Sequence, residues 1–201
     1  MSRTASQTRP RELREAILQY LTRHGLADLS LRPLAKAVGS SPRVLLYYFG
    51  SKEKMVVEVL AEVRQRQRIL YNQIDAPTWE EACRMVWKHM SAPASESLFR
   101  LFFEAYGVAL RHPQRYKAFL RATIEDWLEL MADQLHRGGH WRKQARAFAT
   151  IVLAGFRGFM LDLCATRDRQ RLDRAVNLWL HTLDPLLLNS KEVTQTHVHK
   201  R

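Results

Sequence analysis

The sequence has little of what marks several classes of protein. Its 201 residues hold two cysteines, Cys83 and Cys164, and neither belongs to a Cys-x-x-Cys pair. A disulfide framework or a structural zinc site is therefore not expected. No uninterrupted apolar run reaches the roughly 18 residues that span a bilayer, and residues 1–18 lack the apolar core of a signal peptide. We expect a cytoplasmic protein that does not enter a membrane.

Motifs for catalysis are also missing. The chain has no Gly-x-Ser-x-Gly elbow, phosphate-binding loop or His-Glu-x-x-His pair. Cys164 lies in an apolar stretch without a neighbouring base, which favours an inert thiol. His136 and His140 are separated by Gly138 and Gly139, which disfavours a metal pair on one helix face. We expect no enzyme, no metal and no cofactor.

Positive charge is present in excess. The net charge is +12, and residues 1–54 hold ten Lys or Arg against four acidic residues, which is half of that excess in about a quarter of the chain. A basic segment of this kind favours a polyanionic partner such as nucleic acid or an anionic membrane surface. The alternative is that the charge serves solubility alone.

The hydrophobic pattern has the period of helices almost throughout, and no hairpin signal stands out. Pro10 and Gly25 delimit the first helix, Ser30 caps a helix over 31–37, and Ser41 caps one over 42–48. A long fourth helix follows Ser51 and runs to about residue 74, and the last begins near Asp168. Pro77, Pro93, Pro113 and a pair of glycines separate the others. The sequence predicts an all-α fold of about nine helices.

Two domains are expected: residues 1–54 as a helix-turn-helix DNA-binding domain, and 55–201 as a larger helical domain. Helices 31–37 and 42–48, joined through Gly39, have the proportions of a helix-turn-helix. The residues expected in its small core are Leu34, Ala35, Val38, Val44, Leu45 and Phe49.

The outer face of helix 42–48 should then hold Pro42, Arg43, Leu46, Tyr47 and Tyr48. Arg43 lies near the end that reaches base edges, where arginine binds guanine bidentately. Tyrosine can give its hydroxyl to phosphate and its ring to a thymine methyl. Each has a plainer alternative: either tyrosine can be half-buried packing, and Pro42 can simply start the helix.

The stretch "SLRPLAKAVGSSPRVLLYYFGSKEKMV" resembles the DNA-binding region of TetR-family transcriptional regulators. Leu46 departs from the family, which usually has a phosphate-contacting Tyr there, and Ser40 replaces its Val. The positions that match the family pattern are Ser30, Arg32, Leu34, Ala35, Gly39, Ser41, Leu45, Tyr48, Phe49, Ser51, Lys52 and Glu53.

The resemblance implies which residues touch DNA. Ser30, Arg32, Tyr48 and Lys52 are expected at phosphates, and Arg43 and Tyr47 nearest the bases. Ser41 and Pro42, at the start of the same helix, complete the expected DNA-binding set. Lys52 and Lys54 also fit a solvated helix start.

The last two helices contain an apolar stretch, 145–164, and a seam at alternating steps of four and three. They fit either an intramolecular core or a four-helix bundle between two chains, and the family dimerises through these helices. Glycines in the stretch leave room for close approach of helices. The expected dimer interface is Phe148, Val152, Gly155, Phe159, Leu172, Val176, Trp179 and Leu183.

The middle helices are rich in aromatics and Met, which can line an apolar pocket or simply form the core. The resemblance implies a small-molecule effector there, and an apolar or aromatic one is favoured. The expected ligand-binding set is Trp87, Phe103, Tyr106, Trp127, Met131, Phe156 and Met160.

Together these features predict a sequence-specific regulator, a homodimer on a near-palindromic DNA operator. It is expected to be a repressor that an effector releases. Two alternatives stay open: a basic helical protein that binds nucleic acid without sequence preference, and an activator that has no small ligand.

Overall fold

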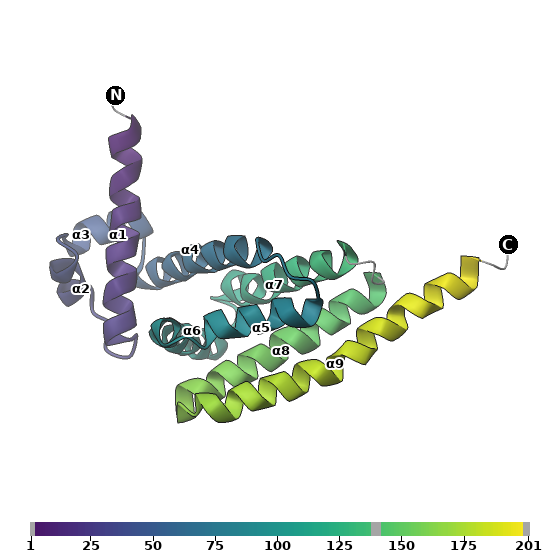
Figure 1. The fold of residues 1–201 in the computed structure, drawn as a ribbon. Coiled ribbons are helices and arrows are strands. Elements are labelled where there is room, and N and C mark those ends of the chain that lie inside the picture. Colours follow the sequence, from purple (N-terminus) through teal and green to yellow (C-terminus); the bar gives the residue numbers. More distant parts are fainter. Residues whose placement is uncertain (1–2, 138–141, 199–201) are drawn as a thin grey trace. The chain divides into compact units, whose positions relative to one another are not determined.

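A computed structural model describes residues 3–137 and 142–198, and the side chains of 11–135 and 145–183. Within these ranges the chain forms nine α-helices and no strand (Figure 1), which confirms the all-α prediction. The helices are α1 (Arg3–His24), α2 (Leu31–Ala37), α3 (Pro42–Phe49), α4 (Lys52–Asn72), α5 (Trp79–Met90), α6 (Pro93–Arg111), α7 (Lys117–Arg137), α8 (Arg142–Thr166) and α9 (Arg169–Val198).

Most helix boundaries fall where capping residues predicted them. Ser41 Oγ accepts a hydrogen bond from the Val44 N–H at 3.2 Å, and Ser51 Oγ accepts one from the Lys54 N–H at 3.1 Å. Ser30 precedes α2 as expected, but its side chain makes no capping bond. The start of α1 also differs, because the helix begins at Arg3 rather than at Pro10. Proline removes one amide donor and does not by itself fix a helix start.

The chain divides into two compact units, Met1–Gln67 with Ser97–Leu120, and Arg68–Glu96 with Arg121–Arg201. The first unit thus contains more than the expected helix-turn-helix segment 1–54. The helices α1, α2 and α3 have too little apolar surface to form a core alone. The start of α4 and most of α6 complete it with buried Met55, Val59 and Leu101. The division into a DNA-binding and an effector domain is a functional one and stays a prediction.

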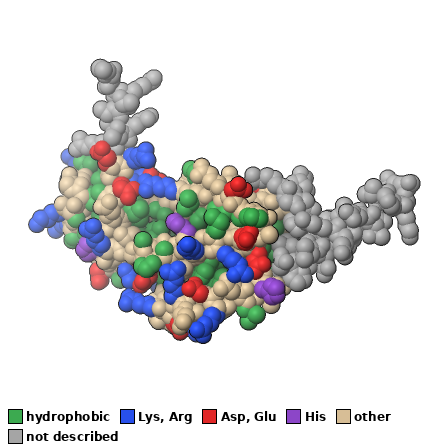
Figure 2. All heavy atoms as spheres, in the orientation of Figure 1, with side chains coloured by type: hydrophobic (Ala, Val, Ile, Leu, Met, Phe, Trp, Pro, Cys, Tyr) green, Lys and Arg blue, Asp and Glu red, His purple; other side chains and the backbone are tan. Residues whose placement is uncertain are grey.

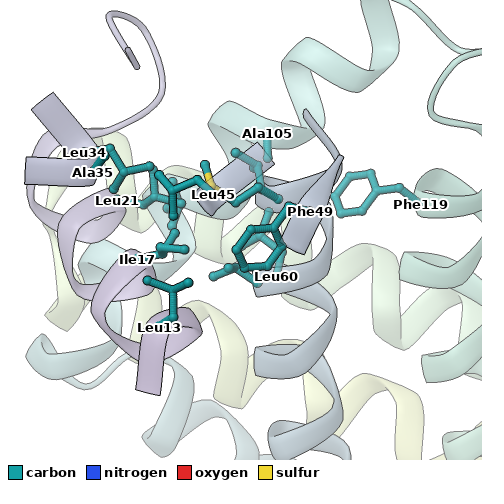
Figure 3. Packing of buried hydrophobic residues seen from close by; sticks show 14 of the residues in the cluster. Leu13, Ile17, Leu21, Leu34, Ala35, Leu45, Phe49, Leu60, Ala105 and Phe119 are labelled. Atoms are coloured by element: carbon teal, nitrogen blue, oxygen red, sulfur yellow. The ribbon is translucent and has the colours of Figure 1, made fainter. Parts of the chain in front are cut away.

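The core of the first unit joins side chains from six helices (Figure 3). Ile17 and Leu21 of α1 and Leu34 of α2 are completely buried, and Leu45 of α3 is 1% exposed. These residues lie at helical spacing, so one stripe of each helix faces the same interior. Full burial of each such side chain contributes about 1.5–3 kcal/mol, which holds the short helices α2 and α3 in place.

The second unit is built around aromatic side chains. The Trp87 ring lies 6.5 Å from Phe156 and 6.1 Å from Phe159, and its indole N–H donates to Asp173 Oδ1 at 2.7 Å. Trp179 completes this cluster, with ring centroids 5.5 Å from Phe156 and 5.3 Å from Phe159. In Figure 1, α8 and α9 run side by side. The aromatic cluster therefore joins α5, α8 and α9.

Gly155 explains how α8 and α9 come so close. A Cβ at this position would lie 2.3 Å from Cζ2 of Trp179, far inside normal contact. The small residue therefore makes room for a tryptophan of the same chain. Gly158 has nothing within 4 Å of the Cβ position among the described atoms, and it is exposed.

One stretch of α8, Ala145–Thr166, is long and apolar enough to cross a membrane by length and composition alone, with a hydropathy of 1.6. It is not free of charge, since it includes Arg157 and Asp162. Its residues Val152, Phe156 and Met160 are buried in the second unit. A core helix has the same composition, so the stretch is weak support for a membrane span.

Candidate nucleic-acid interface

The turn between α2 and α3 is tight and well bonded. Gly39 has a φ of +63°, a left-handed conformation that glycine adopts without steric cost. The Ser40 N–H donates to the Ala35 carbonyl at 2.8 Å, which closes the end of α2. Pro42 then occupies the first turn of α3. Local bonds and a single permissive glycine thus fix the helix-turn-helix that the spacing predicted.

Only one side of α3 is buried. Leu45 and Phe49, four residues apart, are 1% and 4% exposed and anchor the helix. Val44 was expected beside them but is 37% exposed, because one residue along a helix turns the side chain by about 100°. The expected core residue Val38 is half-buried against the same cluster.

The other side of α3 presents large side chains outward. Tyr47 is 82% exposed, so the packing alternative is excluded for this residue, and Tyr48 is 42% exposed. Their rings meet edge-on with centroids 5.4 Å apart. Leu46 is 41% exposed and Arg43 is also exposed, whereas Pro42 is half-buried. Several large apolar side chains exposed together on one eight-residue helix are typical of a contact surface.

Basic side chains on the outside of α2 and α3 are not neutralised locally. Arg32, Lys36 and Arg43 are exposed and form no ion pair with any residue whose side chain is described. By contrast, Arg66 of α4 lies 2.7 Å from both Glu15 and Glu62. Figure 2 shows Lys and Arg side chains exposed over the first helices. The uncompensated charge favours a polyanionic partner.

Three polar residues of the predicted DNA-binding set differ in whether their side chains already form hydrogen bonds within the protein. Ser30 is exposed and its hydroxyl caps nothing, while Ser41 accepts the Val44 N–H. Lys52 is half-buried, and its ammonium donates to the Leu29 carbonyl at 3.0 Å. Lys54, two residues after Lys52, is exposed. The Lys52 ammonium therefore already uses one of its N–H donors within the protein.

The residues predicted at the dimer interface lie mostly in the interior of their own chain. Phe148, Val152, Leu172, Val176 and Leu183 are each at most 6% exposed. Gly155, Phe159 and Trp179 are half-buried within the aromatic contacts described above. These apolar residues are therefore buried within their own chain. A period of 3.5 residues fits a neighbouring helix of the same chain as well as one of a partner.

A different face of α8 is left exposed. Its members are apolar or small, recur at steps of three and four, and were missed because glycine and alanine give no hydrophobic signal: Ile151, Ala154, Gly158, Leu161 and Ala165. Leu161 is 54% exposed, and Leu178 of α9 is 68% exposed. No pattern in the sequence singles out this stripe, because only the burial of the neighbouring apolar residues of α8 separates its exposed members from the rest.

The residues predicted to bind an effector fall into both units. Phe103 and Tyr106 are half-buried in the first unit. Trp87, Phe156 and Met160 are at most 5% exposed in the second, and Trp87 already gives its N–H to Asp173. These three are core residues of their unit, which is the alternative that the composition left open.

The remaining two, Trp127 and Met131, are half-buried on α7. The Trp127 ring lies 5.5 Å from that of Tyr71, and Tyr71 also meets His89 edge-on at 5.7 Å. Tyr71 is 7% exposed, and its hydroxyl has no hydrogen-bond partner among the described residues. Burial raises the pKa of this phenol. An orphaned buried hydroxyl costs about 1–3 kcal/mol, so Tyr71 is a candidate polar contact for a ligand, and sequence reasoning missed it.

Titratable groups suited to other chemistry are scarce where side chains are described. No group of three or more His, Cys, Asp or Glu there could hold a metal ion. Burial raises the pKa of the Cys83 thiol, which makes it a poor nucleophile.

Comparison with known proteins agrees with this geometry. Residues 13–59 match the model of the tetR family of bacterial regulatory proteins. A transcriptional regulator from Rhodococcus sp. has the same fold, with a TM-score of 0.71 at 19% identity, covering 88% of this chain and 96% of its own. GusR from Salmonella enterica has a TM-score of 0.68 at 17% identity, covering 86% and 93%.

A third structure, from Mesorhizobium loti and named as a TetR-family transcriptional regulator, has a TM-score of 0.69 at 18% identity, covering 92% of this chain and 98% of its own. No curated protein matches the chain. The structural matches establish the fold, and the match over 13–59 lies on the helices that form the candidate interface.

Proposed function

Since residues 13–59 belong to the TetR family and the chain has the fold of its transcriptional regulators, we propose that it is a repressor that reads a near-palindromic operator and leaves it when a small effector binds. The fold itself implies DNA-binding transcription regulation. Regulators of this family are generally non-enzymatic. We further propose that the protein represses transcription from an operator, responds to an effector and is located in the cytoplasm.

The exposed face of α3 is the observation that carries the proposal. It offers the exposed guanidinium of Arg43, which has no ion pair among the described side chains, and the Tyr47 ring, which is 82% exposed. The other side of this helix is buried in the core. A helix of this size fits the major groove, where residues near its N-terminus reach base edges. Arg43 and Tyr47 are therefore assigned to bases, and exposed Val44 adds an apolar contact suited to a thymine methyl.

Phosphate contacts come from the surrounding positions. Arg32 is exposed and unpaired, the Ser30 hydroxyl is free of capping, and Tyr48 is 42% exposed. Each can neutralise or hydrogen-bond the backbone without reading sequence. Lys52 can join them only if its ammonium keeps an N–H free beside the Leu29 carbonyl, which a three-donor ammonium allows.

Dimerisation is assigned to the exposed stripe of α8, defined above by Ile151, Ala154, Gly158, Leu161 and Ala165, together with Leu178 of α9. Small residues permit close approach of two helices. The same face on each of two chains would form a twofold interface. Such a dimer carries two α3 helices, and half-sites about 34–36 Å apart, or further, are then expected.

The effector is assigned to the second unit, at Tyr71. Its buried hydroxyl has no partner among the described residues, and its ring contacts Trp127 and His89, which supports a mainly aromatic ligand that supplies one hydrogen bond. Release from DNA then requires the ligand to bind the DNA-incompetent state more tightly than the competent one. The ring cluster favours an apolar or aromatic molecule.

A binding selection against genomic fragments at about 150 mM salt tests the proposal, with Arg43→Ala beside wild type. An enriched near-palindrome supports it, and Arg43→Ala should lose about 1–3 kcal/mol of discrimination at one base position. Arg121→Ala removes an equal exposed charge from α7 and should leave the preference unchanged. Uniform recovery of all fragments would instead indicate binding by charge alone, and the assignment of α3 would fall.

A reporter gene downstream of the enriched site distinguishes repression from activation. Deleting the regulator should raise expression if it represses. A fall in expression would identify the activator alternative.

A further inference from the structure

The first unit contains a pocket of about 180 Å³, and Lys52, a proposed phosphate contact, is the one lining residue that the assignments above use. Its wall is formed by the loop between α1 and α2, the first turns of α4, the middle of α6, and the start of α7. Apolar side chains such as Leu29, Val57 and Val108 make up most of the lining. Two charged residues, Lys52 and Glu53, also border it.

The charges around this pocket do not cancel. Glu53 lies 3.3 Å from Arg115, so its carboxylate already has a cation. A backbone hydrogen bond and one from Ser51, with a smaller contribution from Arg115, keep the pKa of the Glu53 carboxyl low, so it stays ionised. Among the residues whose side chains are described, Lys52 donates to the neutral carbonyl of Leu29, at 3.0 Å, and forms no ion pair within 4.0 Å. One carboxylate thus faces two cations, and the ammonium of Lys52 retains donors for an anion.

The size of the pocket limits what it can hold. Sites for drug-sized ligands span about 300–1,000 Å³, and this one is smaller. Since water occupies about 30 Å³ per molecule in the liquid, the space corresponds to about six waters. A single ring or a short alkyl chain fits that space, with one polar group placed at Lys52.

We propose that this pocket binds a small apolar monocarboxylate, whose carboxylate pairs with Lys52 and whose apolar part lies among Leu29, Val57 and Val108. The site is in the first unit and is separate from the effector site assigned to Tyr71 in the second. It holds the ligand against the loop that leads directly into α2.

A bound carboxylate would also affect DNA binding, and this part rests on the proposed function. It neutralises Lys52, one of the expected phosphate contacts, and lies beneath the residue before Ser30. Phosphate contacts add affinity without sequence information. The ligand should therefore weaken binding to all DNA sequences alike, without changing which site is preferred.

Sodium benzoate is a suitable probe, used on the full chain without DNA and followed by NMR of labelled Leu and Val methyls. Saturable shifts are expected at Leu29, Val57 and Val108. Lys52→Gln should raise the Kd at least tenfold. Lys54→Gln removes the neighbouring exposed charge, which does not line the pocket, and should leave the Kd unchanged. Benzyl alcohol, a neutral molecule of similar size, should bind at least tenfold more weakly.

A second variant, Val108→Phe, fills the pocket while keeping both charges, and should abolish the saturable shifts. Unsaturable shifts, shifts confined to the second unit, or a Kd unaffected by Lys52→Gln and Val108→Phe would each overturn the proposal. The operator selection without benzoate is independent. An enriched operator with no benzoate site refutes only this inference, whereas benzoate binding without any operator refutes only the proposed function.

Discussion

Replacing Gly155 by alanine tests the close approach of α8 to α9. The new Cβ would lie 2.3 Å from Cζ2 and 2.5 Å from Cη2 of Trp179, where carbon atoms normally meet at about 3.5–4.0 Å. The indole cannot turn aside freely, because Phe156 and Phe159 meet it edge-on with centroids at 5.5 and 5.3 Å. Either the helices separate or the ring leaves these contacts.

The magnitude follows from three contributions. Overpacking a core costs about 1–3 kcal/mol, and each aromatic pair that is disturbed adds about 0.5–1.5 kcal/mol. Replacing a helical glycine by alanine gains up to about 1 kcal/mol. The net expectation is a loss of about 2 kcal/mol, which in a chain of this length lowers the Tm by about 4–8 °C.

Gly107→Ala is the matched control. Gly107 is also inside a helix, α6, but a Cβ there meets no described atom within 4 Å. This variant should gain about 0.4–1 kcal/mol. Thermal unfolding followed by circular dichroism, at equal protein concentration, measures both. If Gly155→Ala proves as stable as Gly107→Ala, the packing of Trp179 against α8 is wrong.

Three further predictions concern other parts of the chain. Leu161→Glu should give a monomer by light scattering at micromolar concentration, whereas Leu110→Glu, equally exposed on α6, should leave the mass of the dimer unchanged. Burial raises the pKa of the Cys83 thiol, so iodoacetamide at pH 8 should label it at least tenfold more slowly in native than in urea-unfolded protein; equal rates would contradict its burial. Backbone and Ser51 hydrogen bonds lower the pKa of Glu53 in the folded state, so its contribution to stability is present above about pH 4.5 and is lost as the pH falls; Glu53→Gln should flatten this acid limb.

The two proposed small-molecule sites have different expected signatures. A ligand at Tyr71 acts through the equilibrium between two states of the protein. A carboxylate at Lys52 instead removes one positive charge, and should lower the salt dependence of DNA binding by about one counterion. Lys52→Ala should have the same effect on the salt slope without any ligand, so the two sites can be told apart by salt titration.

The local chemistry of the sequence determined the fold class and the helix-turn-helix of α2 and α3. Ser41 and Ser51 cap their helices as predicted, Gly39 adopts the left-handed turn, and Leu45 with Phe49 buries one side of α3. These features depend on residues within a few positions of each other. Short-range hydrogen bonds and helical period decide them, so they can be inferred from sequence.

Other features depended on which faces meet in space. The seam of Leu172, Val176 and Leu183 has the same apolar spacing whether it packs against its own chain or against a second chain. Only the burial of these residues shows that it packs within its own chain. Val44 is as apolar as Leu45, yet the direction of the core exposes it.

The pocket beside Lys52 in the first unit depended most on tertiary structure. Lys52, Leu29 and Val108 lie far apart along the chain, and no local pattern connects them. Likewise, Tyr71 gives no sequence signal of its unpartnered hydroxyl. Hydrophobic period and capping are properties of one helix, so the sequence alone determined the helices and the helix-turn-helix. A pocket or an orphaned polar group is created by several helices together, so only the tertiary structure decided where these two candidate sites lie.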